Sequence, residues 1–356
     1  MSMTAVLREG TGDRLQGAES LSISRGPIFV GGLDRCGKTT MCAFLTSHPN
    51  IAIPAVGSNM WTYFYGQFGN LGKSQNLERC LRAMLRYTHI RILDPDPERI
   101  RREFLQGPSS YARLFSLFLI HYAERQGKPR WGAQTGLIER YADHLFAAHP
   151  GVKVIHMVRD PRDRYEASLA LWPDGKGRAG GATARWRYSI HLAERNLRMY
   201  LGDYLIVRYE DMVLHTEETI RGVCGFLQEK FQPEMLSMSG ALERRRKLMT
   251  GSQLKSTHAP LSSEFIGRFR TRVSEPELAF IQLHAGGMMR AYGYSLDPLN
   301  LSLQEWARFV LLDWPNQLAR MGAWQAVESI QQRFPAYVGR KPDPKRIVAP
   351  PIGYSR

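Results

Sequence analysis

The chain has 356 residues, with 48 Lys or Arg against 33 Asp or Glu, so its formal net charge at pH 7 is +15. This length can bury one substantial α/β core, and the positive charge favours anionic ligands. Nucleic acid is one such ligand, but the arginines are scattered and no RNA-recognition, zinc-finger or homeodomain motif is present. We therefore expect a globular protein that binds an anion other than nucleic acid.

The four cysteines form no C-x-x-C pair and no framework typical of small secreted domains. No apolar run approaches the length of a membrane span, and the N-terminus lacks the basic start and apolar core of an export signal. These features predict a cytoplasmic protein. Residues 1–25 are polar and glycine-rich, and we expect them to form a flexible tail.

The first predicted element is a short buried strand at residues 28–30, which runs directly into a glycine-rich loop. The chain from 31 to 40 reads Gly-Gly-Leu-Asp-Arg-Cys-Gly-Lys-Thr-Thr. Residues 39–47 are expected to form a helix whose first amides point at an anion. The spacing from Gly32 to Thr39 also fits G-x-x-x-x-G-K-T, in which backbone donors cradle phosphate and the lysine adds a charge. A glycine turn with solvated basic residues is the alternative interpretation.

The next part of the chain is predicted to be mainly helical. Residues 57–72 form a loop dense in Trp, Tyr and Phe, which could be a lid over a ligand or could pack in the core. Helical patterns follow at residues 76–91, 97–105, 109–126 and 138–148.

A second strand is predicted at Val152 to Val158, and it runs into Arg-Asp-Pro-Arg-Asp-Arg-Tyr-Glu-Ala-Ser. Asp160 suits a helix cap and Pro161 the first helical turn, so Arg159 is expected at the end of the strand. Ser168 then lies a little over two turns into the helix. We expect both Arg159 and Ser168 to face the crevice at the carboxyl ends of the strands, where open α/β sheets bind ligands.

The remaining pattern is a helix over about 180–201, a strand at 204–209, and helices over 212–228 and 275–291. Strands that alternate with helices predict a parallel sheet with right-handed crossovers. We find no internal repeats.

Together these segments resemble a known family. A loop reading Arg-Cys-Gly-Lys-Thr, paired with a strand that ends in Arg-Asp-Pro-Arg-Asp, resembles the nucleotide-binding signature of sulfotransferases that use 3′-phosphoadenosine 5′-phosphosulfate (PAPS). Tyr204 to Asp211 and Gly267 to Arg270 match two later segments of bacterial members, in the same order, so the likeness spans residues 27 to 295. It implies an α/β fold like that of P-loop nucleoside triphosphate hydrolases, with a central parallel sheet flanked by helices. The implied sulfotransferase domain covers residues 26–298, and a helical extension and tail cover 299–356.

The resemblance also implies roles for individual residues. Arg35 and Lys38 take the positions that stabilise the transferring group, and Arg35 contacts the sulfate-bearing side of the donor. Arg159 and Ser168 hold the 3′-phosphate, and Gly267 and Arg268 close over it with a backbone amide and a second guanidinium. Tyr209 is a candidate for the adenine side, with a purely structural role as the alternative. Gly37, Lys38, Thr39 and Thr40 surround the 5′-phosphate, and Arg35 and Cys36 belong to the same cofactor-binding loop.

Several positions depart from the family pattern. Members usually carry Ser in place of Cys36 and Thr in place of Lys38, and the bacterial Ser often occupies the place of Ala167 rather than that of Ser168. The segment at 131–135 resembles Trp-Gly-Glu-Lys-Thr but has Ala and Gln in the place of Glu and Lys. We hypothesise that Lys38 restores the missing positive charge.

The implied reaction is in-line transfer of a sulfuryl group to a hydroxyl or amine of a small molecule, glycan or lipid, and no metal is expected. A P-loop kinase or NTPase is one alternative, although the apolar strand ending in a magnesium-binding Asp is missing. A nucleotide-binding scaffold without catalysis is another, because a general base is not evident. The base stays unassigned among Asp34, His89, Asp94, Glu139 and His191.

Beyond the family-like part, apolar residues recur at helical intervals over 301–335. This pattern predicts an amphipathic appendage that breaks near Pro315. Its apolar face packs either on the catalytic domain or on a second subunit, and in the second case the protein is a homo-oligomer. The alternative is that this face rests on a membrane surface near a lipid acceptor.

Overall fold

The computed structural model describes residues 25–54, 56–169, 173–175, 177–240 and 261–334. Almost all of the predicted N-terminal tail, and the basic and proline-rich C-terminal tail, lie outside the described residues.

Five parallel strands form one sheet in the order β2-β3-β1-β4-β5. From β1 the chain first extends the sheet on one side through β2 and β3, and then on the other through β4 and β5. A change of direction of this kind marks the crevice where open α/β sheets bind ligands. The strands are β1 (Ile28–Gly32), β2 (Ile51–Ala52), β3 (Arg130–Gln134), β4 (Lys153–Val158) and β5 (Tyr204–Arg208). The predicted fold class is therefore confirmed.

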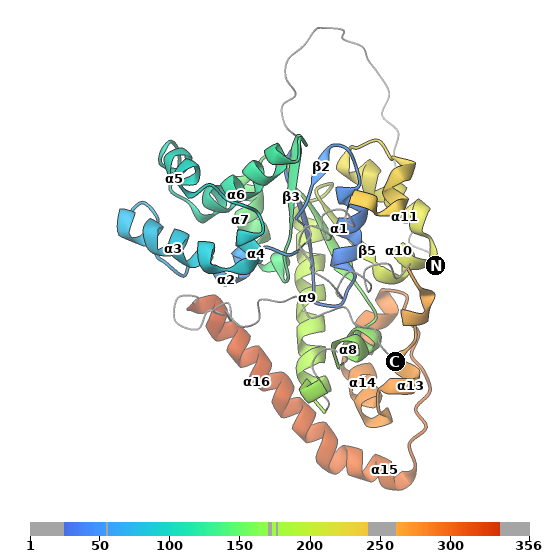
Figure 1. Ribbon diagram of the computed structural model, residues 1–356. Helices are drawn as coiled ribbons and strands as arrows, with labels where there is room; N and C mark the ends of the chain where they lie inside the picture. The colour runs from blue at the N-terminus through green and yellow to red at the C-terminus, as the bar shows by residue number, and fades with distance from the viewer. Residues whose placement is uncertain (1–24, 55, 170–172, 176, 241–260, 335–356) are drawn as a thin grey trace.

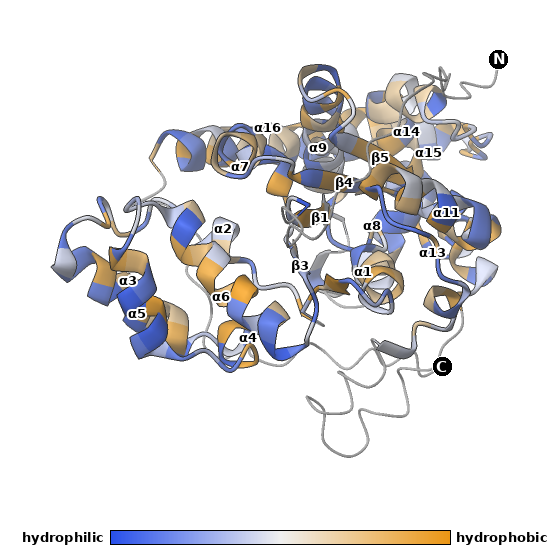
Figure 2. Ribbon diagram, turned by 90° about the horizontal axis from the view of Figure 1, so that it is seen from above, coloured by the Kyte–Doolittle hydropathy of each residue, from blue (hydrophilic) through white to orange (hydrophobic). Residues whose placement is uncertain are grey.

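Helices surround the sheet (Figure 1). Seen from above, α9 and α16 lie on one side of the sheet and α1 on the other, while α2 to α6 gather beyond β3 (Figure 2). The first half of the chain contributes α1 (Lys38–Thr46), α2 (Met60–Tyr63), α3 (Ser74–Arg86), α4 (Thr88–Arg91), α5 (Pro97–Leu105), α6 (Tyr111–Arg125), η1 (Ile138–Tyr141), α7 (Ala142–Ala148) and α8 (Pro161–Leu169). The second half contributes η2 (Pro173–Gly175), α9 (Ala179–Met199), α10 (Tyr209–Leu214), α11 (Thr216–Leu227), η3 (Pro233–Ser237), η5 (Ser263–Phe265), α13 (Phe269–Arg272), α14 (Glu275–Ala291), α15 (Leu303–Arg308), η6 (Phe309–Asp313) and α16 (Trp314–Arg333).

Two apolar cores form because successive side chains of a strand point to opposite faces. Ile28 and Val30 of β1 belong to the core that includes the buried face of α1, whereas Phe29 belongs to the core shared with α2 to α6. Trp61 and Phe64 of the aromatic loop are buried in the second core. Much of that loop therefore packs in the interior.

The predicted boundaries hold at most elements and fail at a few. Strands β2 and β3 were not expected, and the helix predicted at 76–91 is interrupted at Tyr87. The expectation that Tyr209 ends a strand is wrong: β5 ends at Arg208, and Tyr209 is the first residue of α10.

The C-terminal extension forms a bent pair of helices along α9 (Figure 1). A π-helical turn at Phe309–Asp313 lies directly before Pro315, where the break was predicted. Phe309 and Met321 pack with Ala184 of α9 and with Phe280 of α14, so part of the apolar face packs on the rest of the protein. Leu303 and Leu311 remain exposed. Contact of this exposed side with a second subunit or a membrane surface stays a prediction; none of the helices described is both long and apolar enough to cross a bilayer.

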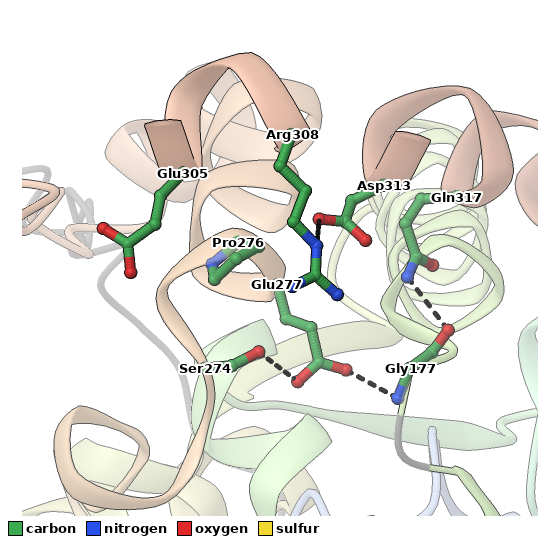
Figure 3. Close-up of a pocket in the computed structure, with 8 residues that line it drawn as sticks. All are labelled: Gly177, Ser274, Pro276, Glu277, Glu305, Arg308, Asp313 and Gln317. Atoms are coloured by element: carbon green, nitrogen blue, oxygen red, sulfur yellow. Dashed lines mark hydrogen bonds and ion pairs between the residues drawn. The ribbon is translucent and has the colours of Figure 1, made fainter. Parts of the chain in front are cut away.

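The extension is also held by polar contacts. Gln317 of α16 accepts a hydrogen bond from the amide of Gly180 at 2.7 Å and donates one to the carbonyl oxygen of Gly177 at 2.9 Å. Figure 3 shows Gln317 at the edge of a pocket of about 310 Å³, in which Glu277 accepts hydrogen bonds from Ser274 and the amide of Gly177. This pocket contains none of the residues that the sequence predicts for the site.

Candidate functional site

The loop between β1 and α1 has a backbone that requires glycine at two positions. Gly32 and Gly37 have φ values of 101° and 87°, in the left-handed region. A Cβ atom at Gly32 would lie 2.2 Å from the carbonyl oxygen of Met157, and one at Gly37 would lie 2.5 Å from the ring of Tyr209. No side chain of the described residues caps α1, so its first amides are available to an anion.

Lys38 is the first residue of α1, and its ammonium group folds back over the loop. The Nζ atom donates to the carbonyl oxygens of Gly32, at 2.8 Å, and of Leu33. Burial lowers the pKa of Lys38, although the nearby Cys36, Asp34 and Glu139 act in the opposite direction. Burial also raises the pKa of the Cys36 thiol to about 11, so Cys36 contributes a neutral side chain to the loop.

Asp34 lies between two arginines that the sequence analysis did not assign to the site. Its Oδ1 atom accepts from Arg164 of α8 at 2.9 Å and from Arg185 of α9 at 3.1 Å. Burial alone would raise the pKa of Asp34, but the two guanidinium groups outweigh it and hold the pKa well below its ordinary value. Asp34 is therefore an ionised anchor that positions cations beside the loop.

Arg159 directly follows β4, as predicted, and it contacts the loop between β1 and α1. Its guanidinium donates to the main-chain oxygen of Arg35 at 3.1 Å and to that of Phe265 at 2.6 Å, and it lies 4.4 Å from the centre of the Tyr209 ring. Its Nε atom is buried and has no partner among the described residues. The structure thus brings together Arg35, Arg159 and Tyr209, which lie far apart in the sequence.

The other residues predicted at the 3′-phosphate have partners within the protein. Ser168 donates to the carbonyl oxygen of Tyr165 at 2.7 Å. Asp163 of α8 accepts from the amides of Gly267, at 2.6 Å, and Phe269, at 3.0 Å. The amide of Gly267 is therefore used in fixing its own segment to α8. Arg268 forms an ion pair with Glu166 of α8, with 3.6 Å between Nε and Oε1.

Beside β3 the crevice contains neutral polar groups, which sequence reasoning missed. Gln134 donates from Nε2 to the hydroxyl of Thr39 at 3.2 Å, which joins β3 to the first turn of α1. Its Oε1 atom and the hydroxyls of Ser58 and Thr135 are buried and have no partner among the described residues. Native proteins rarely leave buried polar atoms unpaired, so each of these atoms is a candidate for a hydrogen bond to a ligand.

The candidates for a general base occupy very different environments. Asp34 is held ionised by its arginines, and Asp94 and His191 are exposed. Glu139 is fully buried and accepts a hydrogen bond from Ser189. His89 is partly buried, and its Nδ1 atom lies 2.7 Å from the carbonyl oxygen of Gly57.

No group of three or more His, Cys, Asp or Glu within the described residues is arranged to hold a metal ion. The candidate site thus consists of the loop between β1 and α1, the cations Lys38 of α1, Arg159 after β4, Arg164 of α8 and Arg185 of α9, and neutral polar groups beside β3.

Comparison with known families identifies the family to which this chain belongs. The model of the sulfotransferase family matches residues 27–233, which is more than half of the chain and includes the loop, β4 and α8. The protein belongs to the sulfotransferase family. The match ends before Gly267, so it does not extend to the last segment of the resemblance. Comparison with curated proteins finds no match.

Two solved structures share the fold of this sulfotransferase. The sulfotransferase domain from the Synechococcus PCC 7002 olefin synthase is 18% identical, with a TM-score of 0.52, over 79% of this chain and 100% of that chain. The sulfotransferase domain from the curacin biosynthetic pathway is 15% identical, with a TM-score of 0.51, over 76% of this chain and 99% of that chain. At these identities the likeness concerns the fold alone.

Proposed function

We propose that this sulfotransferase takes its sulfuryl group from PAPS and transfers it to a hydroxyl or amine of a small molecule, glycan or lipid. The observation that carries the proposal is the contact between Arg159 and the main chain of Arg35, which joins the cation at the end of β4 to the phosphate loop. A nucleotide with phosphates at both its 3′ and 5′ positions needs cationic groups at two such neighbouring places.

The residues present fit such a nucleotide. The uncapped N-terminus of α1 offers backbone amides, and the buried Nε of Arg159 lacks a partner among the described residues. In the proposal, residues 35–40 surround the 5′-phosphate, and Arg159 and Arg268 pair with the 3′-phosphate. PAPS supplies an activated sulfuryl group. Tyr209 supports the loop and stacks on Arg159, so we assign it to the shape of the site rather than to adenine.

The cations explain how the site can favour transfer. Negative charge on the oxygens around sulfur and on the leaving phosphate is stabilised by groups already held in place. Arg35 lies in the turn before α1 and Lys38 is the first residue of α1, and Asp34 of the same turn pairs with Arg164 and Arg185. We propose that Arg35 faces the transferring group and that Lys38 neutralises the phosphate.

Calorimetric titration tests the proposal with three ligands: 3′-phosphoadenosine 5′-phosphate (PAP), AMP, and ATP with Mg²⁺. We expect PAP to bind more tightly than AMP by about 10- to 100-fold, because charge-assisted hydrogen bonds contribute roughly 1.5–3 kcal/mol each. A preference for ATP with Mg²⁺ would instead support a kinase or NTPase. Tight PAP binding without any turnover of PAPS would support a scaffold that has lost catalysis.

A further inference from the structure

The ring of His89 is held in one orientation by a backbone carbonyl. Its Nδ1 atom lies 2.7 Å from the oxygen of Gly57 and 3.0 Å from the hydroxyl of Tyr87. A carbonyl oxygen has no proton to donate, so Nδ1 must carry the hydrogen of this bond. In the neutral ring the lone pair is therefore on Nε2, which is the arrangement that accepts a proton.

The carbonyl that orients His89 belongs to a segment that lies against the end of β3. A Cβ atom at Gly57 would lie 3.1 Å from the carbonyl oxygen of Gln134, so the two backbones are in close contact. Gln134 in turn donates to Thr39 in the first turn of α1. Thr62 donates to the carbonyl oxygen of Gly136 at 3.0 Å, which fixes the segment that carries Gly57 on the end of β3.

The residues that follow Gly57 and Gln134 in the sequence, Ser58 and Thr135, have buried hydroxyls without partners among the described residues. The side chains of Ser58 and Thr135 are each 1% exposed, and neither hydroxyl has a partner among the described residues. Burying a hydroxyl without a hydrogen bond destabilises the folded protein, because the group loses its bonds to water and gains none in return. With Oε1 of Gln134, these hydroxyls are polar atoms whose hydrogen bonds a bound molecule can complete.

We infer that His89 is the general base of this sulfotransferase and that Ser58, Gln134 and Thr135 bind the acceptor beside it. The inference rests on the proposed sulfuryl transfer. The acceptor oxygen forms a bond to sulfur as the bond between sulfur and the 5′-phosphate oxygen breaks. The electron pair of the broken bond leaves with the bisphosphate nucleotide, and the acceptor proton passes to Nε2 of His89.

The protonation state of His89 agrees with this role. Burial lowers the pKa of His89 below its ordinary value of 6.5, although the hydrogen bond to Gly57 acts in the opposite direction. The ring is therefore neutral at pH 7 and able to accept a proton. A neutral imidazole suits a hydroxyl acceptor, because an alkylamine is itself protonated at this pH.

The test compares His89→Asn with His191→Asn, using PAPS as the donor and water as the probe acceptor. The amide introduced by His89→Asn can still donate to the carbonyl oxygen of Gly57, but it cannot take the proton. We expect release of sulfate to fall by about 10²- to 10⁴-fold in His89→Asn. PAP affinity should stay within about twofold, and His191→Asn should behave as wild type because His191 is exposed on α9.

A second measurement does not depend on turnover. Nitrogen-15 spectra of the histidine rings should show Nε2 of His89 without a proton at pH 7, in a signal that His89→Asn removes. A protonated Nε2, or sulfate release by His89→Asn within about threefold of wild type, would overturn the inference. A wild-type protein that does not prefer PAP over AMP contradicts the proposed function instead, so the two failures are distinguishable.

Discussion

The two sides of the candidate site differ in whether their buried polar groups have hydrogen-bond partners within the protein. On the nucleotide side, beyond β1 and β4, the cations are already paired: Lys38 with loop carbonyls, Arg159 with main-chain oxygens and Arg164 with Asp34. On the acceptor side, beside β3, the hydroxyls of Ser58 and Thr135 have no partner among the described residues. A buried charge without a partner costs far more than a buried hydroxyl without one. The proposed nucleotide side is therefore already paired within the protein, whereas the proposed acceptor side retains polar atoms without a partner among the described residues.

Among changes on the proposed nucleotide side, the largest effect is expected from Arg35→Ala, which removes a cation. Turnover should fall by about 10²- to 10³-fold, because the guanidinium is proposed to stabilise charge that develops during transfer. PAP affinity, measured by calorimetry, should change by less than about tenfold. Arg35→Lys is the control that keeps the charge. An equal loss of affinity and turnover would show that Arg35 serves binding alone.

Arg159→Ala should remove the preference for PAP over AMP, a loss of about 10- to 100-fold in relative affinity. Titration with both nucleotides measures it, and Arg198→Ala on the exposed side of α9 should leave the preference intact. Since Arg159 also binds the main chain of Arg35 and Phe265, thermal unfolding should be recorded for each variant. If Arg159→Ala keeps the wild-type preference for PAP over AMP, the 3′-phosphate does not bind at Arg159.

Asp34→Asn tests the pairing of cations on the nucleotide side through stability. We expect a loss of about 1–3 kcal/mol in the free energy of unfolding at pH 7, because two guanidinium groups lose their carboxylate. The pKa of Asp34 in the folded protein lies below its ordinary value of 3.8, so this stabilisation is complete above about pH 4 and is lost as the pH falls further.

Denaturant unfolding of wild type and Asp34→Asn at pH 7 and pH 3 checks this sign. The difference between the two proteins should shrink at pH 3. Glu217→Gln, which removes an exposed ion pair with Arg221, should change stability by less than about 1 kcal/mol. A difference that grows on acidification would contradict the assignment.

On the proposed acceptor side, removing a polar group should raise the stability of the folded protein instead of lowering it. Thr135→Val removes a buried hydroxyl that has no partner among the described residues, so we expect the protein to become more stable by about 1 kcal/mol. Thr183→Val is the matched control, because the buried hydroxyl of Thr183 donates to Ala179 at 2.8 Å and its loss should destabilise. Chemical denaturation measures both. Equal destabilisation by the two changes would mean that Thr135 is already satisfied.

The sequence predicts best those elements whose own residues determine them. The apolar runs of β1 and β4 and the helix at 275–291 lie where their patterns place them. Strand β3 was not expected, because Arg-Trp-Gly-Ala-Gln has little apolar character. A Cβ atom at Gly132 would lie only 2.6 Å from the carbonyl oxygen of Ile28, so close packing against β1, not strand propensity, explains this residue.

The same distinction holds for the candidate site. Loop glycines and the arginine at the strand end belong to local motifs, and so they were predicted. The contact of Asp34 with Arg164 and Arg185 joins residues 130 and 151 positions apart, and no local pattern reveals it. Whether His89 could act as a base depended on which carbonyl its ring meets, a feature of tertiary packing.

The contact between Gly180 and Gln317 has a consequence for how the chain matures. A Cβ atom at Gly180 would lie 2.0 Å from the carbonyl oxygen of Gln317, and the two residues are 137 positions apart. A ribosome adds roughly 5–20 residues per second, so the start of α9 is synthesised roughly 7–27 seconds before the helix that packs against it. During that interval the apolar side of α9 lacks its cover. The packing of α16 on α9 can therefore form only after the chain has been synthesised beyond Gln317.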